Sequence, residues 1–75
     1  MKGLSQLKLD LLEEIRNGKT TFGPGEGENA LELFQPKAHA LIELRDSGYI
    51  DMAEPHREST TGNRYIDRIY RCKLI

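Results

Sequence analysis

The sequence predicts a small α+β domain in which three helices precede a C-terminal β-hairpin. Apolar residues recur at helical spacing in the first half, Pro36 interrupts that pattern, and β-branched and aromatic residues become frequent after Gly48. With 75 residues, of which 37% are hydrophobic and 31% charged, the chain can bury one core. We therefore expect residues 1–75 to form a single domain.

The first predicted helix runs from Leu4 to Asn17. Ser5 can serve as its N-cap by accepting a backbone hydrogen bond from the first turn, and Gly18 is a typical C-terminal stop. The residues expected to face the core form one stripe: Leu4, Leu7, Leu11, Leu12 and Ile15.

The middle of the chain predicts a loop and two further helices. Lys19–Phe22 is a short β-prone segment, and the glycines and proline of Gly23–Gly27 indicate a loop. Glu28–Phe34 then reads as a brief helix. Because Pro36 disfavours helical geometry in the residue before it and fits the first turn of a helix, we expect a boundary there and a third helix over Pro36–Ser47.

The C-terminal third predicts two strands, Tyr49–Glu54 and Arg64–Leu74, joined by the polar turn Pro55–Asn63. Strict alternation along the second strand would give two faces, neither of them purely apolar. One face would hold Ile66, Tyr70, Cys72 and Leu74, and the other Tyr65, Ile69 and Ile75. We therefore expect a β-bulge or burial on both sides.

The charge is distributed unevenly along the chain. Its net value is −1, which argues against nucleic-acid binding by bulk electrostatics. Residues 1–54 carry six basic against ten acidic side chains, a net of −4, whereas residues 55–75 carry five against two, a net of +3. An anion-binding surface is therefore expected on the C-terminal segment, although alternating charges are equally typical of a solvated strand face.

Several classes of function are disfavoured by what the sequence contains. The single Cys72, with His39 and His56, makes neither an internal disulfide nor a complete zinc site, and Cys72 itself fits a small buried hydrophobe. The histidines are too far apart in sequence, and the chain too small for a water-excluding cleft, to favour an enzyme. With no membrane-span-length apolar run and no signal-peptide pattern, we expect a cytoplasmic protein with no metal, cofactor or membrane partner.

The stretch Ala40–Asp51, with its helix, glycine stop and following Tyr49-Ile50, resembles the end of the third helix and the first wing strand of the winged helix-turn-helix superfamily. The whole predicted order of elements is similar to that superfamily, in its small bacterial or phage-type form. The resemblance implies a third helix in the major groove of DNA and a wing on the backbone or minor groove. By position it implies nucleic-acid contacts from Gln35, Lys37 and His39, with Glu43 further along the helix, and from Arg57, Thr60, Thr61, Asn63 and Arg64 on the wing.

Each of these residues also has a plainer interpretation. Lys37 and His39 fit ordinary surface positions, Gln35 fits a helix-boundary side chain that satisfies a backbone group, and Arg57 and Arg64 fit a solvated hairpin.

The sequence is thus compatible with two functions. The first is a small double-stranded DNA-binding protein that regulates transcription. The second is a protein-interaction module or homodimer with no DNA binding, favoured by the net negative charge and a short third helix.

Overall fold

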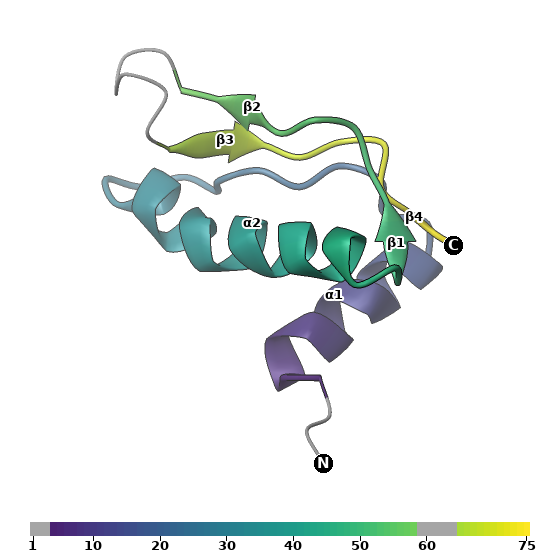
Figure 1. Cartoon of the computed structure of the whole chain (residues 1–75). Coiled ribbons are helices and arrows are strands. Elements are labelled where there is room, and N and C mark those ends of the chain that lie inside the picture. Colours follow the sequence, from purple (N-terminus) through teal and green to yellow (C-terminus); the bar gives the residue numbers. More distant parts are fainter. Residues whose placement is uncertain (1–3, 59–64) are drawn as a thin grey trace.

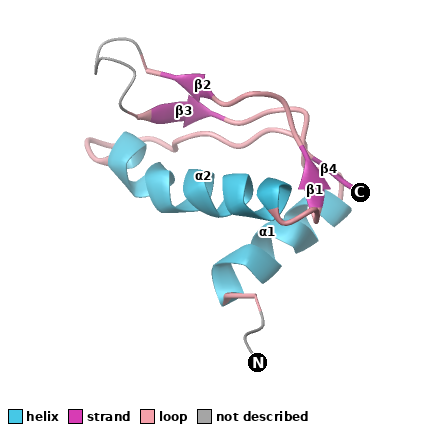
Figure 2. Ribbon diagram, viewed as in Figure 1, coloured by secondary structure: helices cyan, strands magenta, loops and turns pink. Residues whose placement is uncertain are grey.

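The computed structural model describes residues 4–58 and 65–75 (Figures 1 and 2). These residues form two helices and four short strands. Their bounds are α1 Gln6–Arg16, α2 Ala30–Asp46, β1 Ile50–Asp51, β2 His56–Arg57, β3 Ile66–Arg68 and β4 Lys73–Leu74.

Helix α1 confirms the first predicted helix within two residues at its start. The Oγ atom of Ser5 accepts a hydrogen bond from the Lys8 N–H at 3.3 Å, which is the expected N-cap. Gly18 has a φ of +105°, a left-handed conformation that ends a helix and that favours glycine. Leu11 and Ile15 are the residues that α1 buries.

Helix α2 shows that the predicted boundary at Pro36 is wrong, since one helix runs through it. Phe34, Ala38 and Leu41 are buried and continue a single apolar stripe across the proline, so packing on both sides holds the two halves in line. Pro36 lacks the N–H that would bond the Glu32 carbonyl. Both residues are exposed, so this missing bond falls on the solvent side, where it costs least.

The prediction of a three-helix winged helix-turn-helix fold is therefore wrong. Over residues 4–58 and 65–75 the chain is α+β with two helices and short antiparallel strands. Because α2 is continuous, no turn separates a recognition helix from a supporting helix in front of it.

The C-terminal hairpin is present, but it is longer and less regular than predicted. Strand β1 pairs with β4 and β2 pairs with β3, both antiparallel, so β2 lies inside the segment predicted to be a turn. Between the two ladders the Ala53 N–H donates to the Tyr70 carbonyl at 3.0 Å. The β-prone segment before the glycine loop contributes a single bridge, in which Phe22 and Ile69 exchange backbone hydrogen bonds of 2.7 and 2.9 Å.

The buried residues of the second hairpin arm recur every three positions, at Ile66, Ile69 and Cys72. Two irregularities explain this spacing. The pairing register shifts where β3 faces His56 and Arg57, which leaves Asp67 as an extra residue, and Arg71 has a φ of +59°. Each irregularity inserts one residue and returns the next buried side chain to the inner face. The expected bulge is thus confirmed, whereas the two alternating faces are wrong.

The core lies between the hairpin and the helices, which occupy the same side of it in Figure 1. A 2.7 Å ion pair between Lys8 and Glu43 joins α1 to α2 across the surface. In the described part of the chain, neither helix combines the length and the apolar character that a membrane crossing needs.

Candidate nucleic-acid interface

Gln35 connects α2 to the hairpin. Its Nε2 atom donates to the carbonyls of Ile66 at 2.7 Å and Leu31 at 2.8 Å, and its Oε1 atom accepts from the Ile66 N–H at 2.9 Å. The side-chain amide therefore pairs with one residue of β3 as a neighbouring strand would. Both of its polar atoms are used inside the protein, which matches the backbone-satisfying interpretation of this residue.

The exposed side of α2 is acidic. Glu32, His39, Glu43 and Asp46 are all exposed and follow one another at helical spacing. A hydrogen bond from Lys8, together with its positive charge, lowers the pKa of Glu43, so this carboxylate is ionised at neutral pH. Glu43 and Asp46 are paired with Lys8 and Arg45, so this face carries no excess positive charge with which to attract the phosphates of a duplex.

Lys37 and His39 therefore do not combine with Gln35 into a basic reading surface. Lys37 is half-buried and lines a hollow beside the glycine loop, which includes Gly23 and Gly25. His39 stands on the acidic side of the helix.

The residues expected on the wing divide into two groups. Arg57 is exposed in β2, opposite Ile66 of β3. The other candidates lie outside the described residues: Thr60, Thr61, Asn63 and Arg64.

The hairpin carries a group of exposed cations that we call the hairpin cations, namely Arg57, Arg68, Arg71 and Lys73. None of them forms an ion pair within residues 4–58 and 65–75. The basic excess of residues 55–75 indicated this segment. The sequence did not single out Arg68, Arg71 and Lys73, because the alternation of inward and outward side chains along the strand cannot be followed through the β-bulge.

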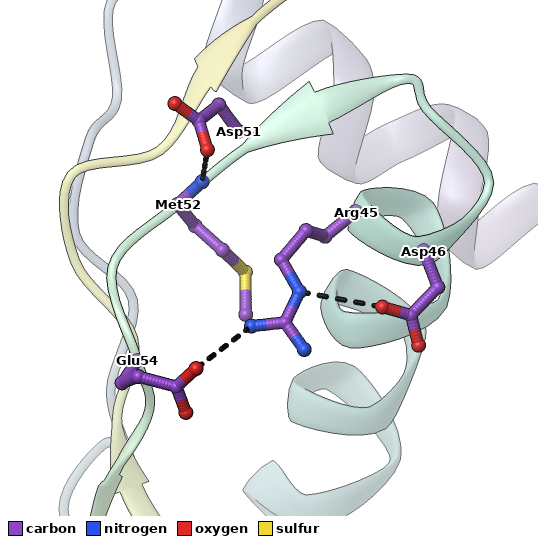
Figure 3. Close-up of polar contacts among 5 residues, drawn as sticks. All are labelled: Arg45, Asp46, Asp51, Met52 and Glu54. Atoms are coloured by element: carbon purple, nitrogen blue, oxygen red, sulfur yellow. Dashed lines mark hydrogen bonds and ion pairs between the residues drawn. The ribbon is translucent and has the colours of Figure 1, made fainter.

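Most cations that the structure describes outside the hairpin have carboxylate partners. Figure 3 shows Arg45 directed at Glu54 and Asp46, with nitrogen–oxygen distances of 3.8 and 3.4 Å. Lys19 lies 3.4 Å from Glu14 and also sits over the Phe22 ring. Within residues 4–58 and 65–75, positive charge without a carboxylate partner is therefore concentrated on the hairpin.

A hollow of about 520 Å³ opens beside β2 and β3, lined by Thr21, His56, Asp67, Arg68 and Tyr70. His56 Nδ1 lies 2.5 Å from Asp67 Oδ1, and since a carboxylate only accepts, the ring nitrogen donates. The register shift creates this arrangement, because it sets Asp67 and Arg68 together opposite His56.

A second hollow of about 460 Å³ lies further along the hairpin arms. Its charged lining residues are Asp51, Arg71 and Lys73, and the Asp51 carboxylate accepts a 3.0 Å hydrogen bond from the Met52 N–H (Figure 3). Cys72, which also lines it, is only 1% exposed, which confirms the expected buried thiol. Burial raises the pKa of this thiol to about 11, so it is protonated at neutral pH.

Comparison with known proteins adds no relative from which a role could be transferred. No family model matches the sequence, and neither a curated protein nor a solved structure matches it. Any functional conclusion therefore rests on the residues and contacts of this chain.

Proposed function

We propose that this protein binds nucleic acid, specifically double-stranded DNA, through its C-terminal hairpin and acts as a regulator. The observation that carries the proposal is the set of hairpin cations, which are exposed and have no carboxylate partner among the described residues. An unpaired surface cation gives up no existing ion pair when it meets a phosphate, so its full attraction is available for binding.

The shape of the hairpin supports this role. A two-stranded β-ribbon is narrow enough to enter the major groove of B-DNA, and both helices lie on one side of the hairpin (Figure 1). Of the acidic side chains of α2, Glu43 is paired with Lys8 of α1, whereas Glu32 accepts a hydrogen bond from the Tyr65 hydroxyl next to β3. Binding by the hairpin thus replaces the helix-led contact expected from the sequence.

The test is fluorescence anisotropy of a labelled duplex of mixed sequence over a range of salt concentrations. If all four hairpin cations meet phosphates, the slope of log K against log salt is about −3.6, since each neutralised phosphate contributes roughly −0.9. Replacing the four by glutamine should abolish binding. Arg16→Gln on α1 is the matched control, because Arg16 is exposed, lies outside the hairpin and should leave binding unchanged. Salt-insensitive binding, or none, contradicts the proposal.

A second candidate function, protein interaction or homodimerisation, rests on a different surface. Tyr49, Leu74 and Ile75 are 46%, 43% and 81% exposed, and the Ile75 N–H donates to the Tyr49 carbonyl. These side chains give one end of the hairpin an apolar character typical of contact surfaces. Sedimentation velocity tests this candidate, with Ile75→Asp expected to dissociate any dimer. A monomer at all concentrations, with no partner recovered, contradicts it.

A cytoplasmic location belongs to the same proposal. The only cysteine, Cys72, is a free and buried thiol, as is usual for proteins of reducing compartments. Fractionation of cells that express a tagged chain would test the location directly.

A further inference from the structure

The hollow beside β2 and β3 is lined mainly by hydrogen-bond donors. Arg68 provides a guanidinium fork, and Thr21 and Tyr70 provide hydroxyl groups. His56 donates its Nδ1–H to Asp67, and the donors left for a ligand are those of Arg68, Thr21 and Tyr70. Such a set suits a ligand that presents several acceptor oxygens.

The one carboxylate of the hollow does not oppose an anion as strongly as a free carboxylate would. Asp67 has a 27% exposed side chain, and its oxygen is directed at the ring of His56. A hydrogen bond from the ring N–H of His56 therefore already engages this carboxylate. The guanidinium of Arg68, which has no ion pair in residues 4–58 and 65–75, supplies the positive charge.

The hollow is large enough to hold more of a ligand than its anionic group. About 520 Å³ falls within the range of small-molecule sites and exceeds what a bare phosphate needs. Tyr70 is half-buried and adds an aromatic surface to the lining, against which a sugar or base can pack.

We infer that the hollow formed by Thr21, His56, Asp67, Arg68 and Tyr70 is a binding site for one nucleotide unit, with its phosphate on Arg68 and the hydroxyls and its sugar against Tyr70. The inference rests on the proposed function in one respect, namely that the bound nucleotide is part of a nucleic-acid strand. A free nucleoside monophosphate presents the same chemistry, and the experiment separates the two sources.

Arg57 provides the control. It belongs to the same hairpin and is equally an exposed arginine, yet it does not line the hollow and its cross-strand partner is Ile66. Arg57→Gln and Arg68→Gln therefore remove the same charge from neighbouring positions, and only the second changes the site. Tyr70→Phe removes one hydroxyl and keeps the ring.

The experiment follows backbone amide shifts during titration with inorganic phosphate, with adenosine monophosphate and with the duplex. Adenosine monophosphate should shift the amide signals of Thr21, His56, Asp67, Arg68 and Tyr70. Inorganic phosphate should shift the same signals, but by less. Arg68→Gln should weaken nucleotide binding about tenfold, the loss expected for a charge-assisted hydrogen bond, and Arg57→Gln less than about twofold. Dispersed spectra of both variants show that they are folded.

The outcomes distinguish this inference from the proposed function. If the duplex binds but Arg57→Gln and Arg68→Gln weaken it equally and the nucleotide shifts no hollow residue, the inference is overturned and the proposed function stands. If the nucleotide binds in the hollow but the duplex does not bind, the site stands, its ligand is the free nucleotide, and the proposed function fails. Shifts spread evenly over the hairpin cations also overturn the inference, since they indicate unspecific attraction.

Discussion

Replacing Gln35 by methionine should remove a large part of the stability of the fold. Methionine keeps the length of the side chain and its place on α2, but it can neither donate to the carbonyls of Ile66 and Leu31 nor accept from the Ile66 N–H. The change therefore isolates the amide contacts.

The size of the effect follows from these contacts. Each intramolecular hydrogen bond contributes roughly 0.5–1.5 kcal/mol, and three are lost. Ile66 is fully buried, so its N–H and carbonyl also lose their partner without access to water. We expect a loss of about 3 kcal/mol, which is comparable to the roughly 3–5 kcal/mol that a core of this size supplies.

The assay is urea unfolding followed by circular dichroism, with an osmolyte titration if the variant is largely unfolded in water. Gln6→Met is the matched control, because Gln6 is exposed on α1 and its side-chain amide donates to Asp10 of the same helix at 2.8 Å. It should change the free energy of unfolding by less than about 0.5 kcal/mol. An equal and small effect of the two substitutions would refute the conclusion that Gln35 holds the hairpin on α2.

Three further outcomes are expected. Pro36→Ala should stabilise the protein by about 2 kcal/mol in the same urea assay, because it restores an N–H to the interior of α2; a destabilised variant would contradict this. Burial raises the pKa of Cys72 from 9.0 to about 11, so this residue contributes stability that is present below pH 9 and lost as the pH rises through 11. Its thiol should react with an alkylating reagent only upon unfolding. The hydrogen bond from Lys8 lowers the pKa of Glu43. Glu43 therefore contributes stability that is present above pH 4.5, its ordinary pKa, and is lost as the pH falls through its lower pKa in the folded protein. Glu43→Gln should thus reduce the loss of stability in acid.

Elements that depend on short-range signals were predictable from the sequence. Ser5 and Gly18 mark the two ends of α1, and each acts on backbone groups within a few residues. The order of helical segments before a hairpin, and the position of the excess positive charge, likewise follow from local composition.

The features that were missed depend on tertiary contacts. The rule that a proline separates helices fails at Pro36, because the core that α2 buries on both sides outweighs the local preference. The bond between Gln35 and Ile66 joins positions 31 residues apart, and nothing near either residue indicates it. Arg68 could be placed on its face only once the bulge at Asp67 was known, and the hollow depends on that bulge.

The continuity of α2 also determines how the molecule responds mechanically. With 17 residues it is a rod of about 25 Å, joined to α1 through Glu43 near one end and to the hairpin through Gln35 near the other. Two helices with a turn between them can rotate against each other when one is pulled, whereas a single rod passes force along its length. A load on the hairpin is therefore carried to α1 without a hinge, and both helices should move with the hairpin as one lever.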